Sequence, residues 1–187
     1  MHVLRPSSLE EYASWYLDRE RLKGDDWPTP SDPRQRVQMM WQRHEGKMRS
    51  WFTEKTRWHL VLLGLDDVSD LVFLESCWTK CEGLVIPGSM NYRLLGQVAE
   101  NAKASDYFSR PSAHKHKVYY DILAAGSLRL EDNDRVAVCS AEESEIRKNP
   151  KARHYLLDGV GRCLPYMVLT KAHAIEYRPV ESFLAER

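Results

Sequence analysis

The sequence predicts an α/β (α+β) fold, a compact mixed sheet with flanking helices, preceded by a helical extension. The chain has 187 residues, enough for one well-cored domain and few for two. Apolar residues make up 43% and charged residues 29%, as in ordinary globular proteins. Short apolar runs alternate with segments of helical periodicity. We therefore divide the chain into an N-terminal helical extension, 1–56, and an α/β domain, 57–187.

The extension 1–56 predicts two helices separated by a break. The first begins near Ser8, where acidic residues follow in the first turn. Prolines in 27–33 end any helix there, and a second helix is expected over 34–52. Ten basic and nine acidic residues make no polybasic arm, so a helical layer over the core is favoured over a separate binding arm. One face of the first helix is aromatic: Tyr12, Trp15 and Tyr16.

The first half of the α/β domain begins with a strand over 58–63. A short helix follows over 65–68, with an aspartate as its N-cap. The apolar run 71–74 either closes that helix or forms another strand. A short strand over 83–88 ends in a Pro-Gly turn, and 92–104 shows the spacing of a helix.

The second half predicts a helix over 118–126, ended by Gly126. A strand over 135–139 is followed by a polar loop, 140–152, and by a strand over 154–157. That strand leads through a glycine-rich turn into an apolar helix. The expected elements after the turn are, in order, the helix through 170, a strand over 174–177 and a closing helix over 180–186.

The turn Asp158-Gly159-Val160-Gly161-Arg162 is the motif that points to function. Two glycines allow positive φ angles and close approach of a ligand to the backbone. The first turn of the next helix has unpaired N–H groups and the positive end of the dipole. Arg162 adds donors that suit two phosphate oxygens. The turn therefore predicts a phosphate site.

Two interpretations of this turn stay open. Asp158 can orient a hydroxyl, hold Mg²⁺ or bind N–H groups of its own loop. Alternatively, Asp-Gly is an ordinary tight turn, and Arg162 pairs with a nearby acid. The longer nucleotide-binding patterns, with more glycines or a lysine, are not present.

The segment 155–162 and its surroundings resemble the ParB/sulfiredoxin-like superfamily, in which a strand runs into an Asp-Gly-x-His-Arg turn and a helix. Upstream, 116–126 resembles the family's glycine-ended helix, and Val136-Ala137-Val138 its next strand. The segments 60–68 and 175–177 resemble the opening and closing strands. The resemblance covers about 57–187, and its specific motif is the Asp-Gly-x-x-Arg turn.

The resemblance implies nucleotide chemistry. Sulfiredoxins use ATP, free-serine kinases use ADP or ATP, and partition proteins bind and hydrolyse CTP. We therefore expect a small-molecule enzyme that uses ATP or another nucleotide with Mg²⁺, for phosphoryl transfer or nucleotide hydrolysis. The implied ligand-binding residues are Gly159, Val160, Gly161, Arg162 and Cys163, and the implied catalytic residues are Asp158, Arg162 and Glu75.

Three of these residues either depart from the family's pattern or allow another interpretation. Gly161 stands where the family has histidine. Cys163 lies in the helix's first turn beside Arg162, which would lower the pKa of its thiol. The alternative is a small buried core residue. Glu75 corresponds to a kinase base near the opening strand and helix, or is a solvated helix acid.

Composition narrows the partners. The 27 basic and 27 acidic side chains give zero net charge, which argues against nucleic-acid binding. The chain shows no signal peptide or membrane-length apolar run, so we expect a cytoplasmic protein with reduced thiols. The spacing of Cys77 and Cys81, with His114 and His116, admits a zinc site, but we predict no metal. The basic stretch 103–117 steers anions or is a polar loop.

Three functions follow as hypotheses. The first is the nucleotide-dependent enzyme with a small-molecule substrate. The second is a non-catalytic ligand-binding or protein-interaction protein on the same fold, which Gly161 favours. The third is a DNA-partition-like binder. The acidic stretch 140–145 caps a helix, is a solvated loop, or is a lid that brings Glu142 or Glu143 to Mg²⁺. The oligomeric state is left open.

Overall fold

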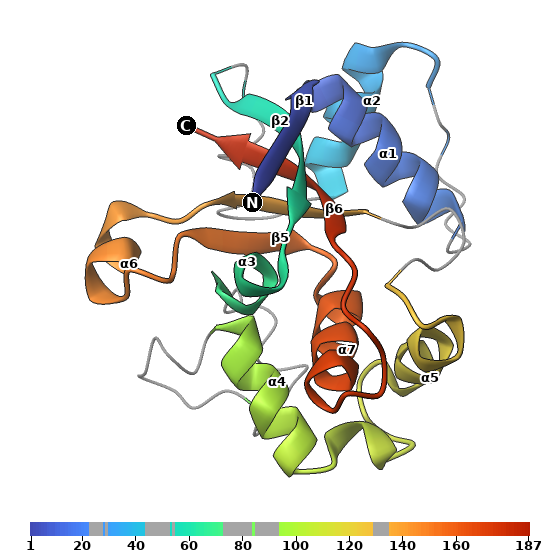
Figure 1. Ribbon diagram of the computed structural model, residues 1–187. Helices are drawn as coiled ribbons and strands as arrows, with labels where there is room; N and C mark the ends of the chain where they lie inside the picture. Colours follow the sequence, from blue (N-terminus) through green and yellow to red (C-terminus); the bar gives the residue numbers. More distant parts are fainter. Residues whose placement is uncertain are drawn as a thin grey trace.

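A computed structural model describes residues 1–22, 28, 30–43, 53, 55–72, 84, 94–128 and 135–187. Its centre is a mixed sheet of six strands in the order β1-β2-β6-β4-β5-β3, with helices on both faces (Figure 1). The predicted α/β class with a mixed sheet is confirmed. The strands are β1 (His2–Ser7), β2 (Arg57–Leu63), β3 (Leu71–Val72), β4 (Arg135–Ser140), β5 (His154–Asp158) and β6 (Val180–Glu186).

Pairing in the sheet is antiparallel between β1 and β2, β2 and β6, and β4 and β5. It is parallel between β3 and β5 and between β4 and β6. The helices are α1 (Leu9–Leu22), α2 (Pro33–Arg43), α3 (Leu65–Ser69), α4 (Leu95–Ala104), α5 (His116–Ala125), α6 (Glu143–Lys148) and α7 (Val160–Lys171), with a 3₁₀ turn at Tyr107–Ser109.

Alternating residues of the central strands divide the core between two faces. Val136 and Val138 of β4 belong to the cluster that includes residues of α3, α4, α5 and α7. Ala137 and Cys139 belong to the cluster under α1 and α2. This period-two alternation is what a sheet covered on both faces requires. The predicted helical layer over the core therefore corresponds to α1 and α2.

The N-terminal segment also supplies a strand that the sequence did not predict. Residues 2–7 form β1, which pairs with β2 and has an irregularity between Val3 and Arg5. The predicted first helix is present as α1. The helix predicted over 34–52 is present over 33–43, and its later residues lie outside the described part of the chain, as does the predicted strand 83–88 apart from Leu84.

The C-terminal predictions were wrong. Residues 180–186, predicted as a helix, form β6, and 174–177, predicted as a strand, lie in an irregular segment. Leu184 and Ala185 favour helices. However, β6 lies between β2 and β4 with both edges paired, and the buried position of the strand overrides this local propensity.

Two smaller predictions also change. The short helix has Gly64 as its N-cap, not an aspartate, and the Asp67 carboxylate accepts the N–H of Gly64 at 2.8 Å. The acid thus caps from the third helical position, as in the second half of a capping box. The predicted loop 140–152 contains α6. The strands predicted over 58–63, 135–139 and 154–157 are confirmed to within a residue or so.

Candidate functional site

The predicted turn lies where β5 ends at Asp158 and α7 begins at Val160. Gly159 between them has φ 103°, a left-handed conformation that other residues avoid. A Cβ atom at Gly159 would lie 2.6 Å from Cγ1 of Val136 on β4. Conformation and close packing therefore both require glycine at this position.

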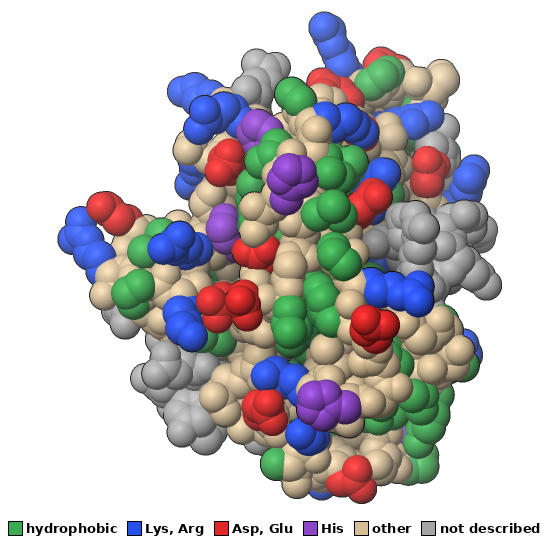
Figure 2. Space-filling view, in the orientation of Figure 1, with side chains coloured by type: hydrophobic (Ala, Val, Ile, Leu, Met, Phe, Trp, Pro, Cys, Tyr) green, Lys and Arg blue, Asp and Glu red, His purple; other side chains and the backbone are tan. Residues whose placement is uncertain are grey.

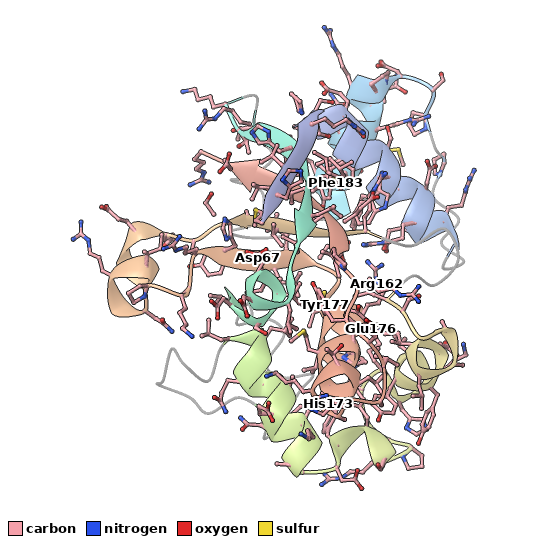
Figure 3. The ribbon with its side chains drawn as sticks, in the orientation of Figure 1. Asp67, Arg162, His173, Glu176, Tyr177 and Phe183 are labelled. Carbon is pink, nitrogen blue, oxygen red and sulfur yellow. The ribbon has the colours of Figure 1, made fainter. Side chains whose placement is uncertain are left out.

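Arg162 lies beneath this turn and is only 8% exposed. Figure 3 labels it where α7 begins. Its Nη2 donates to the backbone oxygen of Arg135 at 2.6 Å, and the Arg135 side chain pairs with Glu181 at 2.9 Å. Arg162, which the sequence predicts to bind phosphate, thus connects α7 with the start of β4. The bond from its guanidinium to this carbonyl oxygen holds the Arg162 side chain against β4.

Asp158 contacts a residue that the sequence did not point to. Its carboxylate pairs with the guanidinium of Arg19 on α1. Arg19 is 4% exposed, donates to Glu20 at 2.8 Å and lies 4.9 Å from the ring centre of Trp15. An arginine beside an aromatic stripe was the signal available in the sequence. The N-terminal helix therefore reaches the turn and orients its carboxylate.

Gly161 faces a lysine from another helix. A Cβ atom at Gly161 would lie 2.7 Å from Cε and 3.0 Å from Cγ of Lys115. Lys115 is the N-cap of α5 and belongs to the basic stretch 103–117. The lysine side chain thus lies across the first turn of α7, beside the position where the resembled family has histidine.

The start of α7 keeps two donors available. The N–H groups of Arg162 and Cys163 donate to the oxygen of Gly159 at 2.9 and 2.8 Å. For the N–H groups of Val160 and Gly161, no hydrogen bond is found among the described residues. Helix N-termini bind anions through such donors and through the dipole. The site offers two backbone donors with a lysine alongside.

Cys163 is a core residue. Its side chain is fully buried, and burial raises the pKa of its thiol to about 12, although Arg162 lowers it somewhat. Desolvation of the thiolate therefore outweighs the neighbouring positive charge. The expected lowering of this pKa was wrong, and the burial of Cys163 matches the alternative of a small core residue.

Other residues singled out in the sequence either lie outside the described part of the chain or bond elsewhere. Glu75, Cys77 and Cys81 lie outside the described residues. His116 Nδ1 bonds the oxygen of Phe108 at 2.8 Å. Within the described ranges there is no group of three or more residues suited to a metal.

The acidic stretch 140–145 lies far from the turn. It follows the end of β4 and leads into α6, and α6 precedes the start of β5, whereas the turn follows the end of β5. Figure 1 shows α6 and the start of α7 well apart. Glu143 pairs with Arg147 at 3.1 Å. The hypothesis of an acidic lid over the turn was therefore wrong.

Charge on the visible surface is mixed. Figure 2 shows basic and acidic side chains interspersed over the face in view, as expected from equal numbers of each. None of the helices in the described part of the chain combines the length and apolarity needed to cross a membrane.

The chain was compared with family models, with curated proteins and with solved structures, and it matches none of them.

Proposed function

We propose that the turn 158–162 binds the phosphate groups of a nucleotide in a small-molecule enzyme of the ParB/sulfiredoxin-like kind. The observation that carries this is the position of Lys115 across the first turn of α7. A helix N-terminus carries partial positive charge, so a lysine beside it is unfavourable unless an anion joins them. The available N–H groups of Val160 and Gly161 complete a set of donors suited to phosphate.

Each residue of the turn has a distinct role in this proposal. Gly159 lets the turn approach β4, and Val160 and Gly161 offer backbone donors. Arg162 acts through the turn, since its guanidinium already bonds β4, and adds positive charge beneath the phosphates. Lys115 is the cation at the surface. It takes the place that histidine has in the resembled family.

Asp158 would orient the acceptor or a metal-bound water. Its carboxylate is held by Arg19, so its direction is fixed before a ligand arrives. Mg²⁺ accompanying a nucleotide is commonly held by phosphates and water with one or two carboxylates, which a single oriented aspartate suits. Phosphoryl transfer and nucleotide hydrolysis depend mainly on such positioning and charge stabilisation. Glu75 stays a predicted base.

The test is thermal unfolding of the full chain with ATP, ADP or CTP, each with and without Mg²⁺. A ligand at a hundred times its Kd stabilises the folded state by about 2.7 kcal/mol. We expect one nucleotide to raise the Tm, and Lys115→Met to remove most of the rise. Lys117→Met is the matched control, because Lys117 is exposed and pairs with Asp121. No rise with any nucleotide would overturn the proposal.

A non-catalytic ligand-binding protein is the second candidate. Glycine at 161 and the commitment of Arg162 to a carbonyl favour it, because both remove side chains from the reacting phosphate. Nucleotide stabilisation without consumption of the nucleotide would select this candidate. The DNA-partition-like alternative requires salt-dependent DNA binding at physiological ionic strength, which the mixed charge of the visible face (Figure 2) does not favour.

A further inference from the structure

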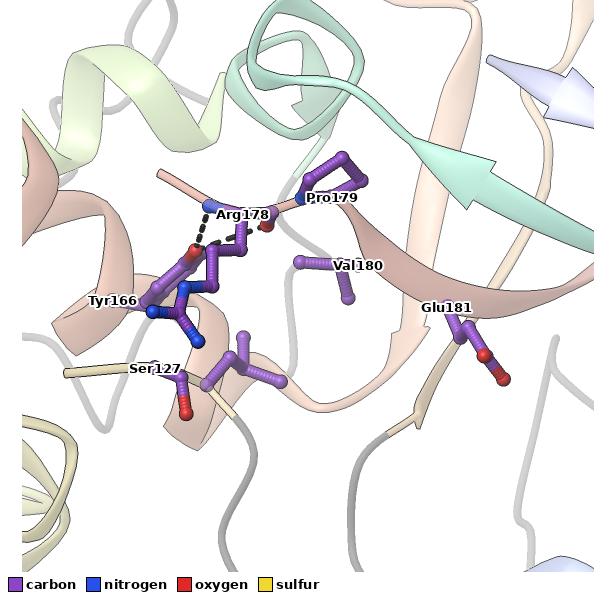
Figure 4. A pocket seen from close by; sticks show the side chains of 7 residues that line it. Ser127, Tyr166, Arg178, Pro179, Val180 and Glu181 are labelled. Carbon is purple, nitrogen blue, oxygen red and sulfur yellow. Dashed lines mark hydrogen bonds between the residues drawn. The ribbon is translucent and has the colours of Figure 1, made fainter. Parts of the chain in front are cut away.

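A concave site away from the turn lies between α7, the start of β6 and the residues that follow α5 (Figure 4). Its volume is about 230 Å³, smaller than the roughly 300–1,000 Å³ of pockets for drug-sized ligands. It therefore suits a small metabolite. The lining residues used below are Ser127, Leu128, Tyr166, Arg178, Val180 and Glu181.

The backbone of Arg178 is fixed by two hydrogen bonds to the side chain of Tyr166. The Tyr166 hydroxyl accepts the N–H of Arg178 at 2.6 Å and donates to its carbonyl oxygen at 3.0 Å. Tyr166 is fully buried on α7, so this anchor is rigid. The Arg178 side chain consequently starts from a defined position at the rim of the pocket, and little conformational freedom of the backbone is lost when a ligand binds.

The Arg178 guanidinium is an available cation. It points toward Ser127 across the pocket (Figure 4), and within the described residues it forms no ion pair or hydrogen bond. Arg19, Arg135 and Arg162, by contrast, each have a bonded partner. A guanidinium matches the planar pair of oxygens in a carboxylate, or two oxygens of a phosphate.

The remaining walls define the other end of the ligand. Leu128 and Val180 are buried and offer apolar contact. Glu181 accepts from Nε of Arg135 at 2.9 Å, and a carboxylate can accept further bonds from a ligand hydroxyl. The pocket thus combines an anion-binding rim, an apolar wall and an acceptor.

We propose that this pocket binds a small organic anion, with its carboxylate or phosphate on Arg178 and a hydroxyl near Glu181. Arg135 connects the pocket with the turn, because its side chain holds Glu181 while its carbonyl accepts from Arg162. Anion binding in this pocket does not depend on the proposed function of the turn.

The experiment uses titration calorimetry of the full chain with glycerate and glycerol 3-phosphate as probes and with glycerol as the uncharged control. Binding of either anion, but not of glycerol, is expected, and the stronger of the two identifies the anionic group. Arg178→Gln should weaken binding about tenfold or more, because it removes a charged hydrogen bond. Arg147→Gln, at an exposed arginine on α6, should leave the Kd unchanged.

Two results would overturn the proposal: equal affinity of the Arg178→Gln protein for the bound anion, or no binding of either anion. The NMR signal of the Arg178 side-chain N–H provides an independent readout, and it should shift with the anion and not with glycerol. Lys115→Met separates this proposal from the previous one. It should remove stabilisation by nucleotide and leave the Kd of the bound anion unchanged.

Discussion

The two faces of the sheet are built from different kinds of residue. The face under α7 is packed mainly by aliphatic side chains. The face under α1 is aromatic at its centre, where Tyr12 stacks on Trp58 at 4.8 Å and meets the edge of Phe183 at 5.5 Å. The aliphatic face consists of elements from within 57–187, whereas the aromatic face needs residues from the start of the chain. Packing therefore joins the segments 1–56 and 57–187, which the division made from the sequence had separated.

Replacing one large side chain on each face tests whether the faces unfold together. Tyr12→Ala should cost about 3–5 kcal/mol and Leu95→Ala about 2–5 kcal/mol, because both residues are fully buried. We expect one cooperative transition in each case, measured by urea denaturation with fluorescence and circular dichroism. Tyr120→Ala, at a residue 46% exposed, should change stability by less than about 0.5 kcal/mol. Two separate transitions would mean that the faces are independent.

The buried ion pair tests how the aromatic face is connected to the turn. Arg19→Met leaves Asp158 without its partner and should cost about 3–5 kcal/mol. Adding Asp158→Asn should recover part of that cost, because the unpaired carboxylate is then removed. A double-mutant cycle measures the coupling. Additive costs would show that the pair does not connect the two regions.

Two glycines with positive φ on the α7 face allow the energetic cost of backbone conformation to be measured separately from the cost of close packing. Gly126 has φ 63° and open space around it, whereas Gly159 has φ 103° and lies against Val136. Gly126→Ala should cost roughly 1–2 kcal/mol for the backbone alone. Gly159→Ala should cost about 1–3 kcal/mol more because of crowding. Equal losses in chemical denaturation would show that β4 yields to the added methyl group.

The smallest expected effect on stability comes from His154, the first residue of β5. This residue lies at the opposite end of that strand from the turn 158–162. Burial lowers the pKa of His154 below its usual 6.5, so the unfolded chain binds a proton more readily than the folded one. Stability should therefore fall as the pH decreases from 6.5 toward the lowered pKa. His154→Gln should flatten this part of the pH–stability curve. An unchanged slope would assign the pH dependence to other groups.

Local patterns predicted the elements of the α7 face well. The helix that ends at Gly126, the strand over 154–157 and the turn after it follow from periodicity and glycine positions in a single segment. Strand β1 and strand β6 were not predictable in this way, because their strand form depends on partners distant in the sequence. The same limit applies to Arg19 and Lys115, which reach the turn through tertiary packing.

The central position of β6 has a consequence for how the protein is made. β2 pairs with β6 so that Leu63 faces Val180 and Arg57 faces Glu186, and β4 pairs with the other edge of β6. During synthesis, the edges of β2 and β4 that pair with β6 therefore stay unpaired until residues 180–186 leave the ribosome. High contact order of this kind slows folding and prolongs the exposure of unpaired strand edges. Nascent chains that stop before residue 180 are consequently expected to depend on chaperones.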